Sequence, residues 1–214
     1  GAAWMSLALE GEARGLVVHG MEGFDYEKAK TALEIPDNYT VNAMAAVAMV
    51  KAVGLSDAVI RKGLKTFKGV PHRIERIGEK GGVPFYNDSK GTNVDSTLVA
   101  LKALPKPILL ILGGQHKGSS YQPLIPLIKK KVKLILTIGE AAPIIERDLK
   151  GAAPIESRGD IDGAMAAAWG AARGGASVLL SPACASFDQY RNYEERGRHF
   201  VRLFKGLVPK ARKT

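Results

Sequence analysis

The chain has 214 residues, and 46% of them are hydrophobic, which is enough apolar surface for one large folded domain or two small ones and excludes wholesale disorder. Its net charge of +10 falls entirely in residues 71–214, because residues 1–70 contain equal numbers of basic and acidic side chains. Such a surface attracts anions, but the basic residues are scattered and no nucleic-acid-binding motif is present, so small anionic substrates are favoured over nucleic acid.

Residues 1–70 predict strands and helices without a complete sheet. Short β-prone runs between glycines in residues 1–35 are typical of hairpin strands. A helix rich in alanine and methionine is expected over about residues 42–53, and a second helix is expected after Ser56, which can cap its first turn. The segment Gly69-Val70-Pro71 then breaks the helical pattern, so we expect a domain boundary near residues 69–73.

Residues 71–214 alternate between strand patterns and helix patterns. Apolar strands are expected at residues 83–87, 107–112, 132–138, 154–156 and 177–181. Amphipathic helices lie between and after them, and the last helix carries the apolar stripe Tyr193, Phe200, Phe204 and Leu207. Continuous apolar strands separated by amphipathic helices are typical of a parallel sheet that is covered on both faces. We therefore expect a doubly wound, Rossmann-like α/β domain.

Polar residues are concentrated after three of the five predicted strands. The first strand is followed by residues 87–93 (NDSKGTN), the second by residues 113–118 (GGQHKG) and the fifth by residues 181–186 (SPACAS). Ligands of open parallel sheets bind outside the carboxyl ends of the strands, near the point where the strand order reverses. We expect one binding site there.

The side chains in these segments suit an anionic ligand. Lys90 and Lys117 are point charges suited to carboxylate or phosphate. The pair Gly113-Gly114 can leave backbone amide hydrogens facing an anion. Asp88 can accept a hydrogen bond from a sugar hydroxyl, although Asp88 and Asn93 are equally typical of turns and helix N-caps.

Other catalytic motifs are incomplete. Residues 114–119 lack the spacing of a P-loop, and no G-x-G-x-x-G follows a strand. Cys184 with His116 or His199 can be imagined as a nucleophile and its base, but a lone cysteine after a buried strand is more typical of a core. Four scattered histidines and one cysteine do not form a zinc site, so no metal site is predicted in this chain.

The sequence also predicts the compartment. The apolar runs are too short to span a bilayer, no export signal opens the chain, and the single cysteine cannot form an internal disulfide. These features favour a cytoplasmic protein without a membrane partner.

The motifs together resemble those of the Mur ligases, a family of ATP-dependent amide ligases, and most closely its glutamate-adding branch. They are Pro71-His72-Arg73 and the segments 87–93, 113–117 and 181–197, which occur in the family's order and spacing. The resemblance covers essentially the whole chain. It implies that residues 1–70 are the end of a central ATP-binding domain and that residues 71–214 are a C-terminal, Rossmann-like, D-glutamate-binding domain.

The resemblance also implies a reaction. The family branch uses ATP with Mg²⁺ to join D-glutamate to UDP-N-acetylmuramoyl-L-alanine through an acyl phosphate, in the synthesis of peptidoglycan precursors. The family's P-loop and magnesium ligands lie upstream of the motifs found here, so the chain alone is expected to be inactive. A monomer is expected.

Individual positions carry over from the family to this chain. The positions that match nucleotide contacts are Asn42, Arg73, Asp88 and Lys90. Those that match D-glutamate contacts are Thr92, Lys117, Ser186, the backbone of Phe187, and Tyr193. Lys90 and Lys117 are the expected catalytic side chains. The chain departs from the family at Asn38-Tyr39, where His-Asn is usual, and this puts the contacts on the adenine side in question.

Two alternatives remain at this point. One is a related amide ligase, such as another Mur ligase or a folylpolyglutamate synthase, although the set Thr92, Lys117 and Ser186 favours the glutamate-adding branch. The other is an α/β module that binds an acidic metabolite without catalysing a reaction.

Overall fold

The computed structural model describes residues 47, 50–51, 53–66, 69–172 and 175–208. The hairpin strands expected in residues 1–35, Asn42 and the Asn38-Tyr39 pair therefore lie outside the described residues. The chain divides into two compact units, Gly1–Phe67 and Lys68–Thr214. In the first unit, the helix predicted after Ser56 is present as α4 (Asp57–Thr66). No helix of the described residues is long and apolar enough to cross a membrane.

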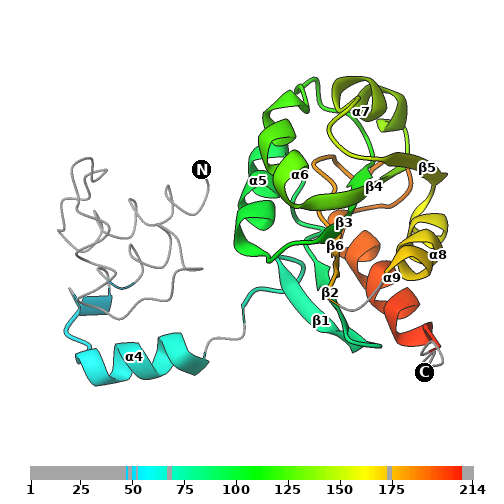
Figure 1. Ribbon diagram of the computed structural model, residues 1–214. Coiled ribbons are helices and arrows are strands. Elements are labelled where there is room, and N and C mark those ends of the chain that lie inside the picture. Colours follow the sequence, from blue (N-terminus) through cyan, green and yellow to red (C-terminus); the bar gives the residue numbers. More distant parts are fainter. Residues whose placement is uncertain (1–46, 48–49, 52, 67–68, 173–174, 209–214) are drawn as a thin grey trace. The chain divides into compact units, whose positions relative to one another are not determined.

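The second unit is built on a six-stranded, mostly parallel sheet (Figure 1). The strands are β1 (Glu75–Lys80), β2 (Val83–Asn87), β3 (Ile108–Gly113), β4 (Val132–Ile138), β5 (Ile155–Gly159) and β6 (Ser177–Leu180). Their order in the sheet is β1-β2-β6-β3-β4-β5. All neighbours pair in parallel except β1, which is antiparallel to β2 at one edge. The α/β fold expected from the sequence is confirmed.

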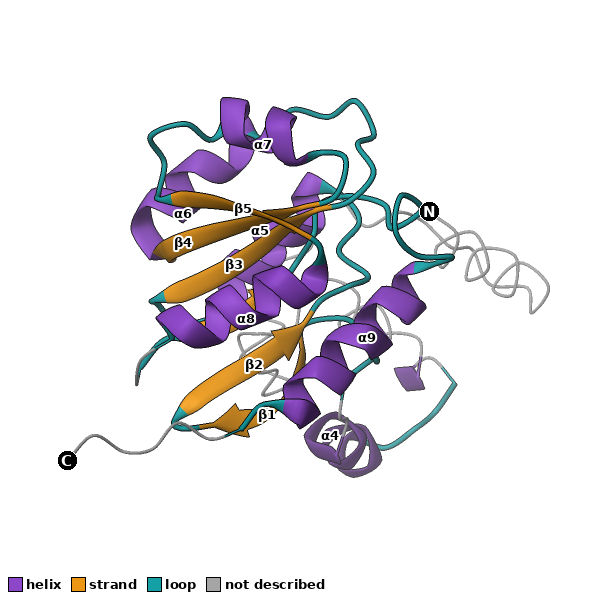
Figure 2. Ribbon diagram, turned by 90° about the vertical axis from the view of Figure 1, so that its right-hand side faces the viewer, coloured by secondary structure: helices purple, strands orange, loops and turns teal. Residues whose placement is uncertain are grey.

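Helices cover both faces of this sheet (Figure 2). They are α5 (Val94–Ala103), η1 (Gln122–Leu124), α6 (Ile125–Lys131), α7 (Ala142–Asp148), α8 (Ile161–Ala171) and α9 (Tyr193–Gly206). Residues of α5, α6 and α7 pack with Leu110 and Leu112 of β3, whereas residues of α8 and α9 pack with Leu109 and Ile111 of the same strand. Alternate side chains of β3 thus enter opposite cores, which explains why its sequence is continuously apolar.

The five predicted strands are all present, but β1 was not predicted. Its sequence, ERIGEK, is mostly charged, and each of its residues is exposed or half-buried. Charged residues are typical of an edge strand, because they discourage pairing with another chain.

The order of the strands places three loops side by side. The chain passes from β2 through α5 to β3, and β6 later fills the position between them. The loops after β2, β6 and β3 therefore leave adjacent strands at the carboxyl end of the sheet. This end of the sheet contains the switch point at which open α/β sheets bind ligands.

Candidate ligand-binding site

Main-chain hydrogen bonds join the three polar loops to one another. The amide of Ala183, after β6, donates to the carbonyl of Gly91, after β2, at 2.9 Å. Gln115, after β3, and Ala185, after β6, exchange two main-chain bonds of 3.0 and 3.2 Å. Segments that are 92 and 70 residues apart in the sequence are thus fixed together at the carboxyl end of the sheet by backbone geometry.

A buried arginine of α9 also holds two of these loops. Arg196 is only 1% exposed. Its guanidinium donates to the hydroxyl (3.0 Å) and carbonyl (2.9 Å) of Ser89, after β2, and to the carbonyls of Cys184 and Ala185 (both 3.1 Å), after β6. Burial lowers the pKa of Arg196 to about 10, so the group is still charged at neutral pH. Arg196 therefore sets the spacing of the loops after β2 and β6.

Arg196 was not predicted as a site residue, although its spacing in the sequence carries a signal. Arg196, Phe200 and Phe204 are spaced by four residues, so they share the buried face of α9. An arginine in line with two core phenylalanines must find hydrogen-bond acceptors inside the protein, because a buried donor without a partner is costly.

The two glycines after β3 serve close packing. Gly113 and Gly114 have φ angles of 128° and 131°. A methyl group on either one would overlap a carbonyl oxygen, that of Ile138 or that of Ala185. The amide of Gly113 donates to Pro182 at 2.9 Å, and that of Gly114 donates to Ile138 at 3.0 Å. The expectation that these amides face an anion was wrong, because both hydrogens are used within the backbone.

Asp88 and Asn93 have different roles in the loop after β2. The side chain of Asn93 accepts from the amide of Ser96 at 2.8 Å and caps α5, as the turn interpretation expected. Asp88 is 3% exposed and accepts from the hydroxyl of Ser181 (2.7 Å) and from the amide of Ile74 (3.1 Å). Burial raises its pKa from 3.8 to about 6, although these hydrogen bonds oppose the shift.

The pKa of Asp88 predicts a loss of stability as the pH rises. Between pH 3.8 and about 6 the folded state keeps the proton that the unfolded chain releases. The contribution of Asp88 to the free energy of unfolding is therefore fully present below pH 3.8 and falls by on the order of 3 kcal/mol by about pH 7. Denaturant unfolding across this range should show that fall in the native chain but not in Asp88→Asn.

The matched control for this prediction is Asp95→Asn. Asp95 is an exposed carboxyl in the first turn of α5. The substitution Asp95→Asn should leave the pH dependence of the free energy of unfolding as it is in the native chain. Identical profiles for the native chain and Asp88→Asn would contradict the prediction.

Arg73 lies in a strained turn against the same loop. The residues on either side of it, His72 and Ile74, have φ angles of 63° and 45°, which are unfavourable for residues other than glycine. The carbonyl of His72 accepts from the amide of Lys90 at 2.9 Å, and Ile74 donates to Asp88. The turn therefore holds the exposed Arg73 beside Lys90 and Asp88, which were also predicted to contact a nucleotide.

Lys90 and Tyr193 come together, although about 100 residues separate them. The ammonium of Lys90 lies 5.5 Å from the centre of the Tyr193 ring, within the range of a cation–π contact. Tyr193 is the first residue of α9, and its carbonyl accepts from the hydroxyl of Ser89 at 2.7 Å. Thr92, two residues after Lys90, is half-buried. Its amide donates a hydrogen bond to the carbonyl of Lys90 at 2.9 Å.

Lys117, Ser186 and Phe187 lie on the other two loops. Lys117 is exposed, two residues beyond the bridge between Gln115 and Ala185. Ser186 follows Ala185 directly and is 2% exposed, whereas the side chain of Phe187 is 67% exposed. The bridge therefore brings the loop of Lys117 next to the loop of Ser186.

The cysteine–histidine pair is not formed. Cys184 is buried, and its sulfur lies 2.9 Å from the hydroxyl of Tyr121. Burial raises the pKa of this thiol to about 11, so it stays protonated. His199 instead contacts Tyr190 and Asp162. Among the described residues, no group of three His, Cys, Asp or Glu side chains is placed to hold a metal ion.

The fold and the site together define a Rossmann-like α/β domain whose switch point gathers lysines, hydroxyls and a buried carboxyl. The glutamate ligase domain of the Mur ligases matches residues 72–184 of this chain. The chain belongs to the Mur ligase family.

Two similar proteins share one name. A UDP-N-acetylmuramoylalanine–D-glutamate ligase of Elusimicrobium minutum is 48% identical over 168 residues, which are 78% of this chain and 37% of that protein. A ligase of the same name from Anaeromyxobacter dehalogenans is 50% identical over 165 residues, which are 76% of this chain and 36% of that protein. The chain thus spans a little more than a third of the length of the curated relatives it matches.

Solved structures share the fold at lower identity. A bifunctional folylpolyglutamate synthase/dihydrofolate synthase of Yersinia pestis, complexed with AMPPNP and a Mn ion, matches with a TM-score of 0.59 at 16% identity. The match covers 79% of this chain and 40% of that one.

Proposed function

We propose that this chain is part of an ATP-dependent ligase that joins D-glutamate to UDP-N-acetylmuramoyl-L-alanine in the synthesis of peptidoglycan precursors. The observation that carries the proposal is the arrangement of the site: the loops that carry Lys90, Thr92, Lys117 and Ser186 leave three adjacent strands at one edge of the sheet. Relatives that are 48% and 50% identical bear the name of this activity.

The proposed domains follow from the same comparison. Residues 1–70 are the end of a central ATP-binding domain, and residues 71–214 are the C-terminal domain that binds D-glutamate. The two compact units of the chain, which divide between Phe67 and Lys68, support this assignment. We propose a cytoplasmic monomer.

The proposed reaction develops negative charge on oxygen twice. ATP first phosphorylates the terminal carboxylate of the muropeptide, and the amine of D-glutamate then attacks the acyl phosphate and expels phosphate. Cations that are already in place stabilise such charge without reorganisation. In this proposal Arg73 and Lys90 contact the phosphates of ATP, and Asp88 accepts from its ribose. Asn42, which lies outside the described residues, is proposed as a further nucleotide contact.

The acidic amino acid is held by its two carboxylates. We assign one carboxylate to Thr92 and Lys117, and the other to Ser186 and the backbone of Phe187. Tyr193 lines the pocket, which its contact with Lys90 supports. Holding the amine beside the acyl phosphate can lower the barrier by on the order of 7–11 kcal/mol.

A magnesium ion would accompany ATP and neutralise its phosphate charge. The Mn ion and AMPPNP named for the Yersinia pestis neighbour support this cofactor. In the family that the motifs resemble, the metal ligands lie upstream of these motifs, and we propose the same arrangement for this protein.

The experiment is an ADP-release assay on the full-length protein with ATP, Mg²⁺ and UDP-N-acetylmuramoyl-L-alanine. We expect release that depends on D-glutamate and is absent with L-glutamate, L-lysine or glycine. The 214-residue chain alone should give no turnover. Release driven by another amino acid would identify a related ligase, and tight D-glutamate binding without release would identify a binding module.

A further inference from the structure

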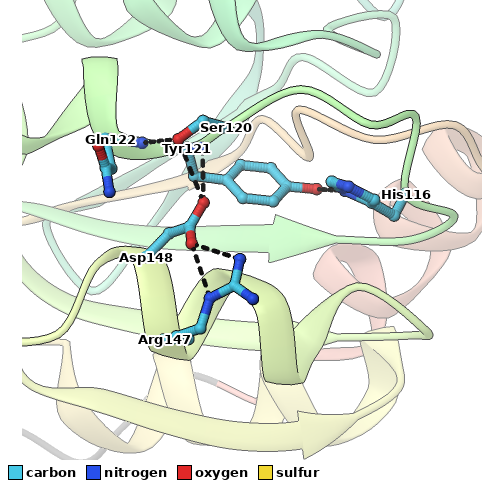
Figure 3. Close-up of polar contacts among 6 residues, drawn as sticks. All are labelled: His116, Ser120, Tyr121, Gln122, Arg147 and Asp148. Atoms are coloured by element: carbon cyan, nitrogen blue, oxygen red, sulfur yellow. Dashed lines mark hydrogen bonds and ion pairs between the residues drawn. The ribbon is translucent and has the colours of Figure 1, made fainter.

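A chain of polar contacts connects the loop of Lys117 to the loop of Ser186 through one buried tyrosine. Tyr121 is 1% exposed, and its ring belongs to the core between the sheet and α5, α6 and α7. Its hydroxyl lies 3.0 Å from Nδ1 of His116, on its own loop, and 2.9 Å from the sulfur of Cys184, after β6. Figure 3 shows the tyrosine pointing toward His116.

The hydroxyl of Tyr121 and the thiol of Cys184 can each donate a hydrogen bond in this series of contacts. Burial raises the pKa of the Tyr121 hydroxyl, and it raises the pKa of the Cys184 thiol to about 11, so both groups keep their protons at neutral pH. The tyrosine can therefore donate to Nδ1 of His116 while its oxygen accepts from the thiol.

The backbone of Tyr121 is held from the opposite side. Asp148, the last residue of α7, accepts from the amide of Tyr121 at 3.1 Å and from the hydroxyl of Ser120 at 3.3 Å (Figure 3). The guanidinium of Arg147 donates to the other oxygen of Asp148 at 2.8 and 3.1 Å. Both the amide and the hydroxyl of Tyr121 are thus fixed.

These contacts close a short loop at its base. His116 and Tyr121 meet through their side chains, while the four residues between them, 117–120, are exposed. Lys117 is the first of these four. A loop that is closed at its base can reach fewer conformations, so its lysine spends more time in the position that a ligand needs.

We propose that Tyr121 is a positioning residue for the amino-acid site: its hydroxyl closes the loop 116–121 on His116 and fixes that loop to Cys184, so that Lys117 and Ser186 stand at a constant spacing. The inference rests on the proposed function, because it takes Lys117 and Ser186 as the two carboxylate contacts. Tyr121 itself touches no reacting atom.

The decisive variant is Tyr121→Phe in the full-length protein, because it keeps the ring in the core and removes only the hydroxyl. A net hydrogen bond is worth about 0.5–1.5 kcal/mol, so the KM for D-glutamate should rise roughly 2- to 13-fold. The KM for ATP should be unchanged, since the ATP contacts lie on other loops. Thermal unfolding should confirm that the variant is folded.

A double-mutant cycle separates this contact from general loosening. His116→Leu should also raise the KM for D-glutamate, and the double variant should be no worse than Tyr121→Phe alone. Tyr190→Phe is the matched control, because its hydroxyl makes a similar contact, 2.9 Å from Nδ1 of His199, away from this loop. It should leave both KM values unchanged.

Three results would overturn the inference: an unchanged KM for D-glutamate in Tyr121→Phe, equal increases for D-glutamate and ATP, or additive effects of the two substitutions. Lys117→Ala in the same assay distinguishes this failure from failure of the proposed function. If Lys117→Ala is inactive and Tyr121→Phe is normal, only the positioning role is wrong. If Lys117→Ala is fully active, the site assignment itself is wrong.

Discussion

Lys117→Ala in the full-length protein is expected to abolish D-glutamate-dependent ADP release, with kcat/KM falling by at least about 100-fold. Lys117 is exposed, and no ion pair with another described residue occupies its ammonium. The charge is therefore available to a carboxylate of the substrate. Alanine removes the charge and its hydrogen bonds in both the bound state and the transition state, and the loop 116–121 contains no other lysine or arginine.

The control for Lys117 is Lys129→Ala. Lys129 is an exposed lysine in the last turn of α6. That helix leads into the amino end of β4, so Lys129 lies at the opposite end of the strands from the site. Its removal changes the net charge equally and should leave kcat/KM within about twofold, as for a surface site. Near-normal turnover in Lys117→Ala would remove this residue from the site.

Arg196→Leu is expected to destabilise the second unit by about 3–5 kcal/mol. The substitution leaves the buried carbonyls of Ser89 and Cys184 without the donor that now satisfies them, whereas the carbonyl of Ala185 keeps the amide of Gln115. Each unsatisfied group costs about 1–3 kcal/mol. Urea unfolding of the 214-residue chain measures the difference directly.

Two further variants make this prediction specific. Arg198→Leu removes an exposed arginine of the same helix and should change the free energy of unfolding by no more than about 0.5 kcal/mol. Arg196→Lys keeps the charge but cannot reach both loops with a single ammonium group, so its loss should be intermediate. A loss below about 1 kcal/mol in Arg196→Leu would show that the guanidinium does not hold the loops.

Periodicity predicted most of the fold. The strands β2 and β4 have the predicted bounds, and the other three parallel strands shift by only a few residues, because fully buried strands leave continuous apolar runs in the sequence. β1 leaves no such run, since it pairs with β2 alone and is charged. A strand of that composition is recognisable only when its partner is known.

The sequence predicted which segments form the candidate site, but it did not predict the contacts between those segments. Gly113 and Gly114 indicated a close approach of the backbone, but the partner is another strand end and not an anion. Tyr121 carried no signal, because an aromatic residue before a helix is typical of a core. Arg196 had a signal in its spacing with Phe200, and its acceptors became known only from the fold.

The sequence by itself determined which residues precede and follow each buried strand, because side-chain burial imposes local periods of two and 3.6 residues. It thereby placed Lys90, Lys117 and Ser186 at strand ends. The tertiary structure alone decided that those ends are adjacent, through the insertion of β6 between β2 and β3. Strand order depends on contacts between residues far apart in the chain, and no local pattern records such contacts. The same holds for the acceptors of Arg196 and the partners of Tyr121.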